Sequence, residues 1–527
     1  MQINDLAFKE KTHVYFILLL ILAFLSTSNT IYGQQNNSPE IPKLTQKSHF
    51  KLDFLSTEMP EDETNMGLAG IHYNFLLNEW SYAGIGMYGA VSGIRGGFFT
   101  LGVNAGIRKN IIPNLFFDTG IHFGGGGGAG APDGGGAYIL PHLNFGYQFS
   151  KFSVEAGYSY INFFDNGSIE GHQLNVAVQV PISYNYASFD HIEKELIVDE
   201  NINNSDWYQE SNKFSLLFHF NNLYLMGDTK DKDTGESMEG ETVRTVGVEL
   251  NSYFKKNTFL FIKADGAYHG IPSGYMDIIL GLGHQFSFNK DRTKLIGKFG
   301  LGAAGGGGID TQGGFIIYPD ISLEQKIYNN IYIALNTGFL MNPNANFVSA
   351  NYGFGLKYYF HQNGLYSSDG DTFSSAKFKG LEIIVGEEIY FDAERNNADP
   401  QNMEQIFLQI NYYLNKNLYV SGQTSFANFG NAGAYAEGIA GLGFSTSSKF
   451  SNKIQLFAQV LTGAAGGGFI DTGEGLIVKP SAGASILLSN KLGLRASVGQ
   501  VMAVDGELNS TLINVALNYR FAKLKAN

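Results

Sequence analysis

The chain of 527 residues contains no cysteine, so neither a disulfide framework nor a cysteine-ligated metal site is available to it. Charged residues are scarce at 16%, and a net charge of −13 without a basic stripe argues against nucleic acid as a partner. Beyond residue 25 no apolar run approaches the ~20 residues of a membrane-spanning helix. Glycine (66), phenylalanine (42) and tyrosine (29) are abundant instead. This composition is typical of a β-rich chain with surfaces that face lipid.

The N-terminus has the order of a secretory signal peptide. Lys9 and Lys11 precede an apolar run at residues 14–25, and small and polar residues follow as far as Gly33. The run is short for a membrane span, although a short anchor is the alternative. We expect cleavage after residues 1–33 and export from the cytoplasm.

Apolar and polar residues alternate along most of the remaining chain. In "INVALNYRF", Ile513 and Val515 alternate with Asn514 and Ala516, and "NYGFGLKYYF" and "LNVAVQV" follow the same pattern. A period of two places apolar side chains on one face of a strand and polar or small ones on the other. The alternation predicts an all-β protein.

These strands recur in three repeats, at residues 48–186, 213–362 and 377–522, joined by linkers at 187–212 and 363–376. Each repeat reads as eight strands with a glycine-rich segment between the fifth and the sixth. Repeats of this length indicate tandem duplication of a domain.

Connections within a repeat alternate between short and long. Turns such as "LNEW", "NKDRTK" and "LNKNL" are tight, whereas "TEMPEDET", "GDTKDKDTGESMEGET" and "DAERNNADPQ" are long and acidic. Short turns at one end and long loops at the other are typical of an antiparallel up-and-down transmembrane β-barrel, with the short turns periplasmic and the long loops extracellular.

This layout resembles small eight-stranded outer-membrane barrels of Gram-negative bacteria, in three tandem copies, and "YGQQNN" resembles envelope proteins of Bacteroidetes. The last strand is expected to end at Phe521, as in such barrels, and the tail "AKLKAN" follows it. The resemblance implies a location in the outer membrane, contact with its lipid, and envelope proteins or a surface ligand as partners.

The strands could close as three barrels or as one barrel of 24 strands, which would enclose a pore. Inward positions such as Gly157, Gly338 and Gly493 are mostly small or neutral, and no segment reads as a plug. The linkers are long and polar. We favour three eight-stranded units.

The glycine-rich segments are "GGGGGAGAPDGGGAYILP" (124–141), "GAAGGGGIDTQGGFIIYP" (302–319) and "GAAGGGFIDTGEGLIVKP" (463–480). A nucleotide loop is excluded because an extended stretch follows where a helix is needed, and no cofactor is expected. Segments without side chains allow close approach of another backbone, a ring or an acyl chain. We expect a seam for docking between units, for lipid or for a partner; the alternative is a strand bend without a ligand. The predicted contact residues are Gly126, Gly128, Asp133, Gly305, Gly306, Gly307, Asp310, Gly466, Gly467, Gly468 and Asp471.

Asp133, Asp310 and Asp471 are predicted to accept turn hydrogen bonds from the backbone. Calcium binding is a weaker alternative, because each loop holds only one such carboxylate, and no metal site is predicted. A proline lies early in each following strand, at positions 141, 319 and 480, where it predicts a weakened ladder.

Titratable residues at inward positions are expected in the first repeat alone. Asp118, His122, His142, Glu155 and Ser159 could form a hydrolytic site, comparable with small barrels that modify lipid A. A hydrogen-bonded network that merely fills the interior is the favoured alternative. We therefore expect a non-enzymatic outer-membrane protein with a structural, scaffolding or partner-binding role. A passive channel ranks second, a lipid A-modifying hydrolase third, and a secreted all-β protein is the class to exclude.

Overall fold

The computed structural model describes residues 41–198, 205–271, 274–344, 346–368, 370, 372–396, 398–446 and 453–526. The expected signal peptide lies outside the described residues. The described chain is antiparallel β-sheet with one short 3-10 helix, η1 (Phe189–His191). None of the described residues belongs to a helix long and apolar enough to cross a membrane.

The strands form three successive groups, here called units 1, 2 and 3. Unit 1 contains β1 (Leu44–Thr57), β2 (Met66–Leu76), β3 (Ser81–Ser92), β4 (Phe99–Ile112), β5 (Leu115–Gly127), β6 (Tyr138–Gln148), β7 (Ser153–Phe163) and β8 (Glu170–Tyr186). Unit 2 contains β10 (Asn212–Met226), β11 (Thr242–Tyr253), β12 (Thr258–His269), β13 (Met276–Phe288), β14 (Thr293–Gly305), β15 (Phe315–Tyr328), β16 (Ile331–Met341) and β17 (Val348–Gln362). Unit 3 contains β18 (Ser375–Arg395), β19 (Ala398–Tyr413), β20 (Leu418–Phe429), β21 (Ala436–Ser445), β22 (Ile454–Gly466), β23 (Leu476–Leu487), β24 (Leu492–Ala503) and β25 (Asn509–Ala526). A short strand, β9 (Glu195–Ile197), lies in the first linker.

Within each unit, consecutive strands pair as antiparallel neighbours, and the first strand also pairs with the last. β1 pairs with β8, β10 with β17, and β18 with β25. The prediction of an antiparallel barrel is confirmed. Because β8 returns to β1, the alternative of a single 24-stranded barrel is wrong.

Polar side chains lie inside the barrels and apolar side chains outside. In β25, Asn514 and Asn518 are buried, whereas Ile513 and Val515 are 40% and 48% exposed. The strand does not end at Phe521 as expected. It continues to Ala526 because "AKLKA" pairs with the beginning of β18, with Lys525 opposite Lys377.

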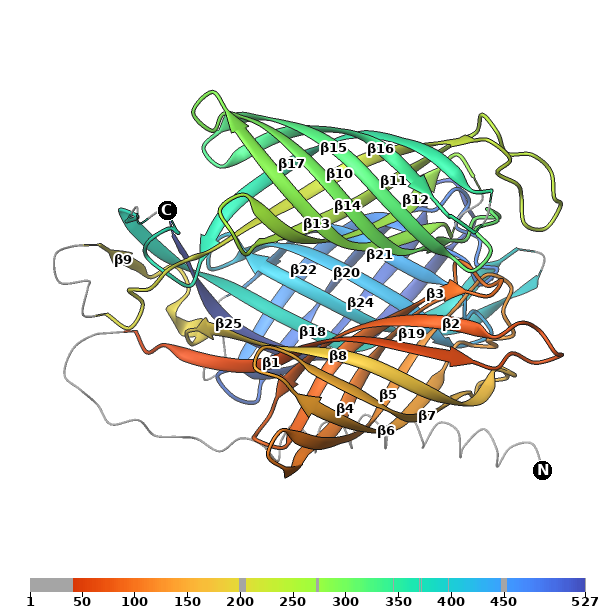
Figure 1. The fold of residues 1–527 in the computed structure, drawn as a ribbon, viewed down its shortest axis with the longest axis horizontal. Helices are drawn as coiled ribbons and strands as arrows, with labels where there is room; N and C mark the ends of the chain where they lie inside the picture. Colours follow the sequence, from red (N-terminus) through yellow and green to blue (C-terminus); the bar gives the residue numbers. More distant parts are fainter. Residues whose placement is uncertain are drawn as a thin grey trace.

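The units contact one another in a cyclic order. β3 of unit 1 contacts β14 of unit 2, β12 of unit 2 contacts β22 of unit 3, and β20 of unit 3 contacts β5 of unit 1. In each case the third strand of one unit meets the fifth strand of the next, and the series closes after three contacts. Figure 1 shows unit 2 at the top, the blue strands of unit 3 in the middle and unit 1 at the bottom. The contacts are therefore those of a closed ring with approximate three-fold symmetry.

One apolar cluster joins all three units on their outer walls. Its buried members are Phe99 and Leu101 of unit 1, Ala303 of unit 2, and Ile406 and Phe426 of unit 3. These side chains point away from the barrel interiors, yet each is nearly inaccessible. Packing between units thus removes outward apolar surface that elsewhere stays exposed.

The linkers pack together at the short-turn end. Trp207 is fully buried there with Ala187, Leu365, Phe378 and Leu524. Its indole nitrogen Nε1 donates to the carbonyl oxygen of Ile41 at 2.9 Å. Segments from all three units are consequently held at this end as well.

Candidate contact seams and interior networks

The glycine-rich loop of unit 2 lies against unit 1 without space for side chains. A Cβ added to Gly305 would lie 2.5 Å from the carbonyl carbon of Gly96 and from the amide nitrogen of Gly97. Gly305 has a φ of +150°, which favours glycine. Across the same seam, the amide of Gly96 donates a hydrogen bond to the carbonyl of Gln312. Backbone therefore packs directly on backbone between these two units.

Small residues also lie between the contacting strands of the first two seams, where they allow close approach. A Cβ on Gly89 of β3 would lie 2.9 Å from the Cβ of Ala303 on β14. A Cβ on Gly266 of β12 would lie 2.8 Å from the Cβ of Ala464 on β22. The same glycine–alanine contact thus recurs between units 1 and 2 and between units 2 and 3.

At the third seam, between units 3 and 1, the larger residue lies on the third strand of its unit and the glycine lies on the fifth strand of the other. Gly89, Gly266 and Phe426 are equivalent because each pairs with the first residue of the following strand, at Phe99, Met276 and Ala436. The position equivalent to Ala303 is Gly125, which packs on the backbone of Ala427 in unit 3. A large residue on one strand therefore accompanies the smallest residue on the other.

The remaining predicted glycines lie in the same loops. Gly128, Gly306 and Gly467 each pack on a carbonyl of the loop that follows the third strand of their own unit. That loop is the one that meets the next unit, so these glycines bring three loop segments together at each seam. Gly126 and Gly466 lie at the ends of β5 and β22, and Gly307 and Gly468 adopt φ near +60° in the loops.

Each predicted aspartate accepts a backbone hydrogen bond within its loop. Asp133 accepts from the amide of Gly128 at 2.7 Å, Asp310 from Gln312 at 2.9 Å, and Asp471 from Gly473 at 3.2 Å. Within the described ranges, no three His, Cys, Asp or Glu residues lie together in a way that could hold a metal ion.

Asp133 also lies at the seam between units 1 and 3. A Cβ on Gly433 of unit 3 would lie 2.8 Å from its Oδ1, and the amide of Gly433 donates to the carbonyl of Gly134 at 3.2 Å. The loop lies beyond the strand ends, and burial raises the pKa of the Asp133 carboxyl to about 7.

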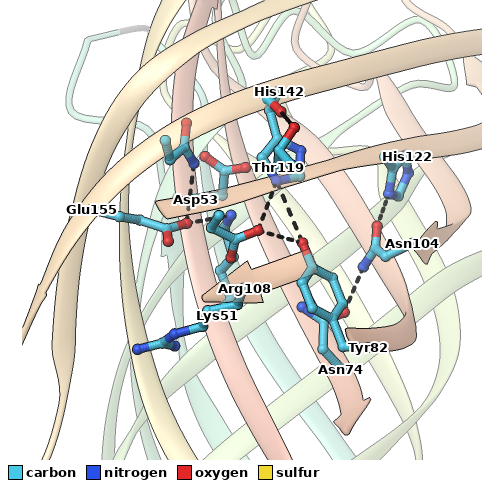
Figure 2. A network of polar contacts seen from close by, with 12 residues as sticks. Lys51, Asp53, Asn74, Tyr82, Asn104, Arg108, Thr119, His122, His142 and Glu155 are labelled. Carbon is cyan, nitrogen blue, oxygen red and sulfur yellow. Dashed lines mark hydrogen bonds and ion pairs between the residues drawn. The ribbon is translucent and has the colours of Figure 1, made fainter. Parts of the chain in front are cut away.

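Three of the predicted polar residues, Asp118, His142 and Glu155, belong to one connected network inside unit 1 (Figure 2). The ammonium of Lys51 contacts Glu155 at 2.5 Å, and Gln179 donates to both Glu155 and Asp118. Asp118 also accepts from the hydroxyl of Tyr82 at 2.7 Å. The network is buried and internally paired, so it fills the barrel.

His142 lies between two of the other candidates. Its Nε2 is 3.3 Å from Asp118 Oδ1, and Ser159 is its direct neighbour across the β6–β7 ladder. Ser159 Oγ has no hydrogen-bond partner among the described residues. His122 belongs to a separate branch, in which its Nδ1 contacts the side chain of Asn104. The structure thus brings Asp118, His142 and Ser159 together and leaves His122 apart.

Charged interiors are not confined to unit 1, contrary to the expectation from the sequence. In unit 2, Lys298 pairs with Glu249 at 2.8 Å and with Asp320 at 3.0 Å. In unit 3, Lys479 pairs with Glu388 at 2.6 Å and with Glu437 at 2.7 Å. Their sequence signal is a single charge at an inward position of an alternating strand, as in "LIGKFGL".

No protein-family model matches the chain, and no curated protein matches it. Among solved structures, a mutant of the ferric enterobactin receptor PfeA from Pseudomonas aeruginosa matches with 11% identity and a TM-score of 0.26, covering 90% of this chain and 80% of that one. OccK11 (OpdR) of the same organism matches with 9% identity and a TM-score of 0.21, covering 93% of this chain and 100% of that one. Superpositions this loose support no conclusion beyond what the strands of this chain show.

Proposed function

We propose that the chain is an outer-membrane protein in which three eight-stranded barrels form a pseudo-trimer within one polypeptide. Its role is structural or scaffolding, and the long loops present a surface to partners outside the cell. The observation that carries this proposal is the cyclic contact between the third strand of each unit and the fifth strand of the next.

The surface of the barrels supports insertion into a membrane. Large apolar side chains such as Leu282, Phe299, Leu335 and Phe354 are about half exposed on outer walls. A water-soluble protein would cover such a continuous apolar surface, whereas lipid satisfies it. The polar interiors satisfy the other requirement of a narrow barrel, which is that buried polar groups find partners.

Membrane fractionation and purification of the exported chain test the proposal. We expect the protein in the outer-membrane fraction, a requirement for detergent, and one compact species on a semi-native gel. Replacing Gly305, Gly306 and Gly307 by valine should loosen this species, while a chain that stays monodisperse in plain buffer would refute membrane insertion.

A lipid hydrolase is the second candidate, favoured by the contact of His142 with Asp118 and by the position of Ser159 opposite His142 in the β6–β7 ladder. In such a reaction His142 would take the hydroxyl proton of Ser159 as Oγ attacks the carbonyl carbon of a lipid ester, and would pass that proton to the alcohol that leaves when the ester C–O bond breaks. Water would then hydrolyse the acyl-serine, which releases the fatty acid and restores the serine. The test is mass spectrometry of phospholipid and lipid A incubated with the wild type and with Ser159→Ala. A wild type that leaves both lipids unchanged excludes hydrolysis.

A further inference from the structure

Units 2 and 3 each carry an apolar groove at the same place on the outer wall. The groove of unit 2 has a volume of about 660 Å³ and is lined by residues that include Leu282, Gly297, Phe299, Pro319, Ile321 and Phe339. The groove of unit 3 has a volume of about 730 Å³ and is lined by residues that include Leu442, Ala458, Val460, Pro480, Ala482 and Val498. The positions correspond, since Phe299 pairs with Pro319 as Val460 pairs with Pro480.

The groove follows from missing side chains and a missing part of the ladder. Gly297 faces outward, and a Cβ added there would meet nothing within 4 Å. Beside it, the β15–β16 ladder passes from the pair Ile317–Met341 directly to the pair Asp320–Gly338. Pro319 lies in this gap and cannot donate a backbone hydrogen bond. The outer wall of the barrel therefore lacks both side chains and ladder pairs at this place, and its surface is concave there.

The ladder gap recurs beside Pro141 and Pro480, but unit 1 carries larger side chains beside it. One outward row crosses the fifth, sixth and seventh strands of each unit. It reads Thr119, Leu143, Tyr158 in unit 1; Gly297, Ile321, Thr337 in unit 2; and Ala458, Ala482, Val498 in unit 3. Tyr158 thus stands where unit 2 has Thr337, and its hydroxyl is held at 2.5 Å from His172 Nδ1.

We propose that the grooves of units 2 and 3 each bind one acyl chain of a membrane phospholipid. The inference rests on the proposed insertion of the barrels into a membrane. The grooves are continuous with the exposed apolar wall, where Leu301, Leu323 and Leu335 flank the groove of unit 2. The exposed surface of their lining is mostly apolar, and polar lining side chains such as His284 and Gln500 already bond to neighbouring side chains, so a polar ligand would lose hydration while gaining few partners. A protein strand cannot add to this wall because the sheet offers no free edge there.

Variants that place the outward side chains of unit 1 at the equivalent positions of units 2 and 3 test this proposal. Gly297→Thr with Thr337→Tyr gives unit 2 the row of unit 1, and Ala458→Thr with Val498→Tyr does so for unit 3. Native mass spectrometry of the purified chain, supplied with palmitoyl-oleoyl phosphatidylethanolamine, counts the lipids retained as detergent is stripped. We expect two firmly held phospholipids on the wild type, one on either double variant and none on the quadruple variant.

Val248→Tyr serves as the matched control, because Val248 is 42% exposed on the outer wall of β11 and outside the groove. It should keep both phospholipids. Retention of two phospholipids by the quadruple variant, equal loss in the control, or retained masses of lipid A would each overturn the proposal. Compact migration on a semi-native gel establishes that every variant is folded. A wild type that is soluble without detergent would defeat the membrane proposal itself, which is a distinct result.

Discussion

Gly305 of unit 2 lies against Gly96 of unit 1 with space for a hydrogen atom and none for a methyl group. The glycine-rich loops of this chain are therefore surfaces of contact within the molecule. Each follows the fifth strand of its unit, and that strand meets the third strand of a neighbour. The seams and the barrel interiors give four predictions.

A methyl group at Gly97 should weaken the seam between units 1 and 2. Gly97 has a φ of +96°, and its added Cβ would lie 2.7 Å from the carbonyl carbon of Gly305. Gly240 has nearly the same φ, +90°, but its nearest neighbour would be 3.9 Å away. Both Gly97→Ala and Gly240→Ala carry backbone strain of about 1–2 kcal/mol. Only Gly97→Ala should lose a further ~1–3 kcal/mol through overpacking, measured by urea unfolding in detergent. Equal losses in the two variants would count against a tight seam.

The seam between units 1 and 3 should weaken as pH rises. Burial raises the pKa of Asp133 to about 7, so the folded protein holds a proton that the unfolded chain has released above pH ~4. This contribution to stability is present at pH 4 and is lost as pH rises through 7, by at most about 1.4 kcal/mol per pH unit. Asp133→Asn keeps an acceptor for the amide of Gly128 and should flatten the dependence. An unchanged pH profile of unfolding in that variant would show that another group titrates.

Removing Lys479 should destabilise unit 3 strongly. Lys479→Met leaves Glu388 and Glu437 buried without their cation, at a cost of about 3–5 kcal/mol. Adding Glu388→Gln and Glu437→Gln should restore most of the loss, because no buried charge then lacks a partner. Lys290→Met, at an exposed turn, is the control and should change the unfolding midpoint little. Failure of the triple variant to recover would mean that the pairs contribute more than charge compensation.

The interiors should not conduct ions freely. Each contains buried ion pairs, such as Lys51–Glu155, Lys298–Asp320 and Lys479–Glu437. Eight strands leave an interior that side chains fill. We expect planar bilayers containing the pure protein to show no sustained large channels. Steady conductance that scales with protein concentration would instead favour the passive channel.

The alternation of residues was sufficient to predict an antiparallel barrel and the inward direction of Asp118, His142 and Glu155. It could not identify their partners, because a period of two fixes the face of a residue but not the residue opposite it. Lys298 and Lys479 carry the same signal in units 2 and 3, but each stands alone among glycines and apolar residues. The contact of Phe426 with the central cluster is of a different kind. Its outward direction indicated lipid, whereas another unit lies there, and strand periodicity contains no information about a second barrel.

The cyclic contacts have a consequence for divergence. A trimer of identical chains repeats each substitution at every interface, so an enlarged residue must be tolerated three times. Here the partners belong to one gene product, and each position varies alone. Phe426 occupies at one interface the position that glycine holds at the other two, and Gly125 holds there the position of an alanine. By the same freedom, Tyr158 occupies on one outer wall the position that Thr337 and Val498 hold on the other two, which leaves a nearly symmetric assembly with three unlike faces.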